Sequence, residues 1–150
     1  MMLRRDSPRD YAALAISLAL AGVFIYAGLD KIRAPLQFAD SISAFAILPA
    51  AFINLLALGL PPFEVACGVL LIGRPTRRIA ALAAMLTSVI FFAALLSALV
   101  RGLTLDCGCF GSGTPSRPRM WVEAALDIGL FGGALFVYLR SISRSRLQGR

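Results

Sequence analysis

The sequence predicts an all-α integral membrane protein: a bundle of four transmembrane helices that forms a single membrane domain over residues 1–150. Three observations predict it. Hydrophobic residues make up 59% of the chain and charged residues only 15%, against about 25% charged residues in an ordinary globular domain. The mean hydropathy is +0.80. Four apolar runs are each long enough to cross about 30 Å of hydrocarbon as helices, which satisfy their own backbone groups in lipid.

The first two spans are expected at about residues 11–29 and 50–72. The first follows basic residues, as in a signal peptide. Its apolar run is longer than that of a signal peptide and lacks a clear Ala-x-Ala site, which favours a retained helix. The second span is interrupted by Pro61 and Pro62, so we expect Glu64 near the start of a fresh half-helix, where a carboxylate is favourable.

The other two spans are expected at about residues 79–100 and 121–139. The third contains no charged residue, whereas the fourth carries two carboxylates. On the fourth span, Gly129 and Gly133 match the small-xxx-small pattern of close helix contacts. This pair predicts packing within the bundle or across a dimer.

The distribution of Lys and Arg predicts the orientation of the bundle. Ten of them lie at the two termini and in the connection between the second and third spans, and five lie on the other side. Because Lys and Arg are enriched in cytoplasmic loops, both termini are expected in the cytoplasm. A loop over about 101–119 then faces outward. In a bacterium this places the chain in the inner (plasma) membrane, with the loop toward the periplasm, where disulfides persist.

Composition also excludes several classes of function. The net charge of +7 does not indicate nucleic-acid binding, because the basic residues flank apolar runs, where they meet lipid headgroups. The chain has no histidine, which removes bis-histidine haem ligation, histidine-containing zinc sites and a histidine general base. Two neighbouring thiolates supply only half of a tetrahedral zinc shell, so no metal site is predicted.

A Cys-Gly-Cys-Phe-Gly motif is the strongest chemical feature, with Cys107 and Cys109 in the outward loop. Two thiols one residue apart can close a small disulfide ring, which is expected to be strained and therefore labile and oxidising. The motif predicts thiol–disulfide exchange; the alternatives are a fixed disulfide or two thiols without a role. Cys67 differs, because it lies inside the second span and is interpreted as a small apolar residue at a helix contact.

Charged residues inside or at the ends of the spans form a second candidate site. Intramembrane carboxylates are costly and are functional candidates by default. Glu64 lies in the second span, Glu123 and Asp127 share one face of the fourth, and Lys31 follows the first. These four are the candidate proton or quinone site. The alternative is structural: Glu64 and Asp127 pair with Lys31 or bond to neighbouring helices.

Several short motifs together resemble the MauE/DoxX-like family of small bacterial four-helix membrane proteins, and MauE more than DoxX. The resemblance covers about 110 residues, and its most specific part is the Cys-Gly-Cys-Phe-Gly motif. The other matching pieces are Ala27-Gly28-Leu29-Asp30-Lys31, Phe45 through Pro49, Pro61-Pro62-Phe63-Glu64, Gly68, Leu70-Leu71, Trp121 and Asp127.

The resemblance implies periplasmic thiol redox chemistry. MauE is linked to maturation of methylamine dehydrogenase alongside a thioredoxin-like partner, and DoxX-type proteins are linked to quinone-coupled sulfur oxidation. The architecture is also similar to vitamin K epoxide reductase-like enzymes, which use a Cys-x-x-Cys pair and further loop cysteines. This chain has the shorter Cys-x-Cys and no second outward pair, which indicates that any relay needs a partner protein.

The leading hypothesis is therefore a membrane thiol–disulfide oxidoreductase that supports maturation of a partner protein. Cys107 and Cys109 exchange electrons with a thioredoxin-like protein, and a quinone between the helices is a candidate acceptor. The first alternative is a non-catalytic assembly subunit of a larger membrane complex. The second is a small proton-coupled transporter that uses Glu64, although the four spans show no inverted-repeat character.

Overall fold

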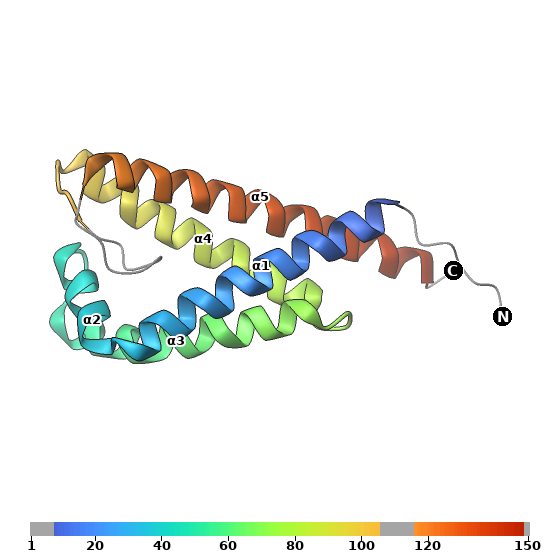
Figure 1. Ribbon diagram of the computed structural model, residues 1–150, viewed down its shortest axis with the longest axis horizontal. Coiled ribbons are helices and arrows are strands. Elements are labelled where there is room, and N and C mark those ends of the chain that lie inside the picture. The colour runs from blue at the N-terminus through green and yellow to red at the C-terminus, as the bar shows by residue number, and fades with distance from the viewer. Residues whose placement is uncertain (1–7, 106–115, 149–150) are drawn as a thin grey trace.

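The computed structural model describes residues 8–105 and 116–148. This part of the chain is helical and contains no strand. Four helices are long and apolar enough to cross a membrane, which confirms the predicted four-span bundle. The helices are α1 (Pro8–Arg33), α2 (Pro35–Ala44), α3 (Ala50–Ile72), α4 (Arg77–Val100) and α5 (Arg117–Gln148), shown in Figure 1.

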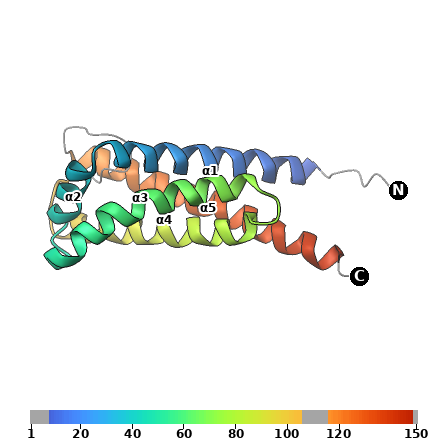
Figure 2. The same cartoon turned by 90° about the horizontal axis from the view of Figure 1, so that it is seen from below.

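The four long helices run up and down, so that the start of α1 and the end of α5 lie at the same end of the bundle (Figures 1 and 2). The short helix α2 lies at the opposite end, which we call the α2 end. Helix α1 packs chiefly against α3, and α4 against α5. These two pairs meet along narrower contacts, α1 with α5 and α3 with α4, and they diverge toward the α2 end (Figure 1).

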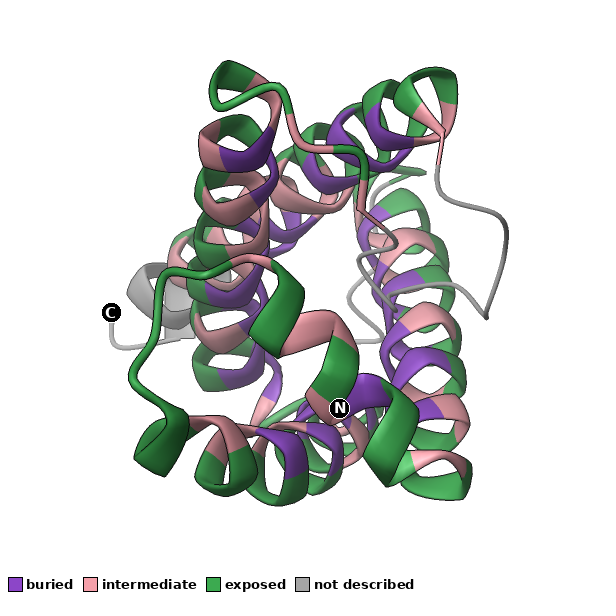
Figure 3. Cartoon of the chain, turned by 90° about the vertical axis from the view of Figure 1, so that its left-hand side faces the viewer, coloured by how far each residue is buried: buried purple, intermediate pink, exposed green. Residues whose placement is uncertain are grey.

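Each long helix buries one stripe of residues and leaves the rest of its surface to lipid. On α1 the buried positions recur three or four residues apart, the period of one helix face. They are Ala13, Ser17, Leu20, Ala21, Phe24, Ala27, Gly28 and Lys31. The outward faces carry large apolar side chains such as Leu58, Ile79 and Leu86. Figure 3, viewed from the α2 end, shows the buried positions on the inner faces of the helices.

Two glycines bring the backbones of α1 and α3 into contact. A Cβ atom at Gly28 would lie 2.7 Å from the carbonyl oxygen of Pro61, and one at Gly68 would lie 2.9 Å from that of Ala21. No side chain fits at either position without moving one helix away from the other. Small residues at such crossings permit the close packing that stabilises helices in lipid.

Helix α4 ends in a Schellman motif at the α2 end. Gly102 has a φ of +72°, a left-handed conformation that glycine adopts without penalty. Its N–H donates to the Leu99 carbonyl at 3.1 Å, and the Leu103 N–H donates to the Ala98 carbonyl at 3.0 Å, the two bonds of this motif. Leu103 then packs on the buried residue Leu95 and its neighbours.

The structure departs from the sequence expectations in three places. The break expected at Pro61 and Pro62 is wrong, because α3 is continuous through both. In hydrocarbon an interrupted backbone has no water to bond, so a helix that lacks two N–H donors is still favoured. Helix α2 was not expected; it begins with Pro35 in its first turn, where proline is tolerated. Helices α1 and α5 are also longer than their apolar runs, because their polar ends continue the helices.

Candidate functional site

A buried ion pair joins α1 to α3. The Lys31 ammonium donates to Glu64 Oε1 at 2.8 Å and to Oε2 at 2.7 Å. Lys31 is 3% exposed and Glu64 2% exposed. The ammonium also lies 5.3 Å from the ring centroids of Phe38 on α2 and Phe91 on α4, within the range of cation–π attraction. Both carboxylate oxygens and the ammonium are therefore satisfied without water.

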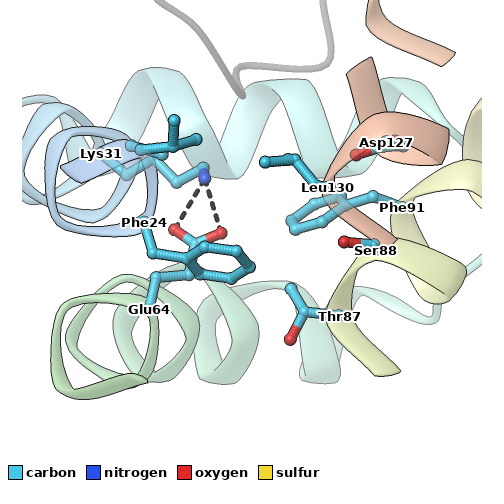
Figure 4. A pocket seen from close by; sticks show the side chains of 10 residues that line it. Phe24, Lys31, Glu64, Thr87, Ser88, Phe91, Asp127 and Leu130 are labelled. Atoms are coloured by element: carbon cyan, nitrogen blue, oxygen red, sulfur yellow. Dashed lines mark hydrogen bonds and ion pairs between the residues drawn. The ribbon is translucent and has the colours of Figure 1, made fainter. Parts of the chain in front are cut away.

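A small cavity lies beside this ion pair, where all four spans converge. Its volume is about 30 Å³. Figure 4 shows Lys31 and Glu64 on one side of it, and Ser88, Phe91 and Asp127 on the other. Asp127 is ten residues into α5, which places it about 15 Å from the start of that helix at 1.5 Å per residue. The cavity is thus deep within the bundle, at the boundary between the two helix pairs.

On the α4/α5 side of the cavity, two polar side chains have oxygens that lack hydrogen-bond partners, unlike those of the ion pair. Asp127 Oδ2 and Ser88 Oγ are buried, and neither has a hydrogen-bond partner among the described residues. Thr87, next to Ser88, donates its hydroxyl to the Ala83 carbonyl at 2.9 Å. Buried polar atoms without partners are rare in folded proteins and call for an explanation.

Glu123 lies one helical turn from Asp127, toward the α2 end. Its Oε1 accepts a hydrogen bond from Arg119 Nε at 3.2 Å. Its Oε2 is buried and has no partner within the described part of the chain. Of the four charged residues singled out in the sequence, the structure brings Lys31, Glu64 and Asp127 to one cavity, while Glu123 stands outside it.

Cys107 and Cys109 lie outside the described residues. The chain is described up to Leu105 and again from Ser116. The end of α4 and the start of α5, next to these residues in the sequence, lie at the α2 end (Figure 1). Two contacts anchor the described residues that follow α4: Arg101 donates to the Phe45 carbonyl, and the Leu105 N–H donates to Met120 Sδ at 3.5 Å.

Cys67 is separate from that end of the molecule. It is 2% exposed, and its thiol donates to the Ala80 carbonyl of α4 at 3.3 Å. This position agrees with its interpretation as a helix-contact residue.

The two glycines singled out on α5 face different surroundings. A Cβ at Gly133 would meet Ile16 of α1 at 3.3 Å, whereas one at Gly129 would meet nothing within 4 Å. Only Gly133 therefore serves a contact within the bundle.

Sequence reasoning nominated only the three charged residues of the cavity and missed its other lining residues, among them Ser88 and Phe91 of α4. Ser88 forms with Thr87 a polar pair in the middle of a run whose one other polar residue is Ser97, and this pair was the available signal. Phe91 gave none, because a phenylalanine in an apolar span is equally suited to lipid.

Comparison with known proteins shows which family the chain belongs to. Residues 9–140 match the family described as "Methylamine utilisation protein MauE". The chain belongs to the MauE family. It is also similar to the methylamine utilization protein MauE of Paracoccus denitrificans, with 35% identity over 124 residues. That match covers 82% of this chain and 66% of the relative, so the chain spans just under two thirds of that protein's length. No solved structure matches the chain significantly.

MauE-family membership confirms the resemblance drawn from the sequence motifs. Together with four apolar spans it identifies a multi-pass membrane protein. The match extends from the second residue of α1 to Arg140 in α5, so it includes both the cavity and the cysteine motif.

Proposed function

We propose that this MauE-family chain is a protein of the bacterial plasma membrane that supports maturation of a partner protein by thiol–disulfide exchange. The partner belongs to a methylamine-utilisation system, as the name of the relative suggests. Cys107 and Cys109 carry the exchange with a thioredoxin-like protein outside the membrane. The proposal extends to the inner membrane as the location and to both termini as cytoplasmic.

The observation that carries this proposal is the position of the residues that flank the cysteine motif. The end of α4 and the start of α5, which adjoin Leu105 and Ser116 in the sequence, lie at the α2 end, opposite the start of α1 and the end of α5 (Figure 1). The Lys and Arg distribution assigns the two termini to the cytoplasm. The motif then faces the oxidising side of the membrane, where dithiols and disulfides interconvert through partner proteins.

The electrons and protons of the exchange balance between the two proteins, and no further group is needed. As the Cys107–Cys109 disulfide forms, the disulfide of the partner breaks, and two electrons and two protons pass to the partner thiols. The reverse reaction reduces the chain again. A thiolate attacks a disulfide sulfur in each step, through a mixed disulfide.

A quinone was a candidate acceptor, and the cavity between the helices is the place where it was expected. A cavity of about 30 Å³ has room for about one water molecule. A quinone ring is several times larger, and the Lys31 ammonium that would bond its carbonyl is already engaged by Glu64. The cavity does not fit a quinone ring in this conformation, and we derive no step through one.

Thiol trapping in intact cells tests the exchange. Alkylation followed by mass spectrometry of the full chain is expected to show both oxidised and reduced Cys107 and Cys109, in proportions that follow added oxidant or reductant. A Cys109→Ser variant is expected to accumulate a mixed disulfide with a thioredoxin-like protein. Cys67→Ser is the matched control and should change neither result, because Cys67 is buried at a helix contact. One fixed redox state under every condition would contradict the proposal.

A second candidate is a non-catalytic assembly subunit, and the outward position of Gly129 favours it. Gly129 is exposed, and a Cβ added there would meet nothing within 4 Å, so a helix of a neighbouring protein can approach α5 closely there. In that case the chain copurifies with a partner in fixed stoichiometry. Gly129→Leu would break the complex, and Cys107→Ser would leave its function intact.

A further inference from the structure

The central cavity contains one carboxylate more than its cations can neutralise. From α1 it receives Lys31, from α3 Glu64 and from α5 Asp127, while α4 contributes the uncharged Thr87 and Ser88. Lys31 bonds both oxygens of Glu64, and no other cation among the described residues lies at hydrogen-bond distance from Asp127. A charged group deep in a membrane protein is costly unless it is paired or neutralised.

The surroundings of Asp127 provide partners for a proton carrier. Its Oδ2 and the Ser88 hydroxyl oxygen both line the cavity region without a partner of their own among the described residues. The cavity of about 30 Å³ has room for about one water molecule, which needs two to four polar partners. Asp127, Ser88 and the Lys31–Glu64 pair are the groups around this space (Figure 4).

A line of polar residues on α5 leads from this cavity toward the α2 end. Arg119, Glu123 and Asp127 follow one another at intervals of four residues, which sets consecutive Cβ atoms about 5–6 Å apart on one helix face. Glu123 is buried, and its Oε2 has no partner in the described ranges. The Arg119 side chain is 31% exposed. The line therefore runs from a partly exposed residue to the cavity.

We propose that the cavity is a binding site for one exchangeable proton, held by Asp127 and reached from the α2 end through Glu123. The proton neutralises the carboxylate that Lys31 leaves unpaired. Glu64 stays ionised in its pair. This goes beyond the proposed thiol exchange and does not depend on it, because it is carried by residues of the spans. If the exchange also holds, the site can take up or supply the protons that the dithiol releases or binds.

Labelling with a hydrophobic carbodiimide tests which carboxyl group carries the proton. Such reagents modify protonated carboxyl groups in apolar surroundings and leave a stable adduct that peptide mass spectrometry locates. In the purified full chain in lipid nanodiscs, Asp127 is expected to be labelled, with an extent that falls as the pH rises. Glu64 is expected to remain unlabelled. Asp127→Asn removes the labelled site, and Asp127→Glu restores it.

Lys31→Met is the control for access of the reagent, because it leaves Glu64 without its cation and Glu64 should then be labelled. If Glu64 becomes labelled in that variant while Asp127 is unlabelled at every pH in the unaltered chain, the proposal is overturned. Protection of Asp127 by sodium or potassium at fixed pH would also overturn it, in favour of a cation site.

Infrared measurement of hydrogen–deuterium exchange tests the path. The carbonyl stretch of protonated Asp127 shifts on deuteration, and Glu123→Gln is expected to slow this shift several-fold at unchanged Asp127 labelling. Ser97→Ala, a change on α4 away from the cavity lining, is the matched control. An unchanged rate in Glu123→Gln would overturn the assigned path.

Discussion

The two helix pairs of this bundle differ in whether their buried polar groups have hydrogen-bond partners. In the α1/α3 pair, every described polar group at the contact has a partner: Lys31 bonds Glu64, and Ser17 donates to the Leu71 carbonyl at 2.7 Å. In the α4/α5 pair, Ser88, Glu123 and Asp127 each retain a buried oxygen without a partner in the described ranges. The polar groups of the α1/α3 pair are thus hydrogen-bonded, whereas the α4/α5 pair contains buried oxygens that can still bind a proton or a water molecule.

The pairs also differ in how their backbones meet. Gly28 and Gly68 set α1 against α3 with no space for a side chain. Helix α4 instead presents fully buried alanines, among them Ala81, Ala84 and Ala98. Because the cavity lies between a closely packed, hydrogen-bonded pair and a less satisfied one, substitutions on the α1/α3 side should cost more stability than matched substitutions on the α4/α5 side.

The largest expected effect comes from breaking the ion pair. Lys31→Met should lower the free energy of unfolding by about 3–5 kcal/mol, because it leaves the Glu64 carboxylate buried without a cation. Lys31→Met combined with Glu64→Leu should recover most of this loss. Unfolding in mixed micelles, followed by circular dichroism, measures both. Asp127→Asn is the matched change on the other pair and should cost little. Equal losses for Lys31→Met and Asp127→Asn would contradict the contrast.

An intermediate effect is expected from adding a methyl group at the α1/α3 crossing. Gly28→Ala and Gly68→Ala should each destabilise the chain by about 1–3 kcal/mol, the usual cost of overpacking, because the added Cβ meets backbone atoms. Gly59→Ala, on the exposed face of α3 with nothing within 4 Å, should be neutral or stabilise by up to about 1 kcal/mol through helix propensity. Thermal unfolding of the three variants in one detergent gives the order.

The smallest effect compares two buried serines. Ser17→Ala removes a hydrogen bond to α3 and should cost about 1 kcal/mol. Ser88→Ala removes a hydroxyl that has no partner in the described part of the chain, and its effect should be near zero. The same unfolding assay distinguishes them, and a larger loss for Ser88→Ala would show that its hydroxyl has a partner in the membrane.

The spans could be predicted from the sequence because apolar length is a local property. The predicted 50–72 agrees with α3 at both ends, and α4 begins two residues before the predicted 79. Helix α2 could not be predicted in this way, since its ten residues are too few for a span and its burial depends on Phe38 alone. The break at Pro61 was expected from a rule for helices in water, and hydrocarbon overrides that rule.

Sequence could nominate the charged residues of the site but not their partners. Both a functional and a paired interpretation were open for Glu64 and Asp127, because spacing within one helix does not say which helix it faces. The structure pairs Glu64 with Lys31 and leaves Asp127 apart. Likewise the spacing of Gly129 and Gly133 indicated one shared face, and only Gly133 contacts α1.

The buried ion pair also has a consequence for how the chain enters the membrane during translation. Lys31 is two residues from the end of α1, so its long side chain can reach the headgroups while α1 is alone in the bilayer. Glu64 lies in the middle of α3, where an unpaired charge opposes insertion by about 3 kcal/mol. Because α1 is synthesised before α3, we expect α3 to insert beside a cation that is already in the bilayer. The order of the helices along the chain would thus let Lys31 of α1 lower the cost of inserting Glu64 with α3.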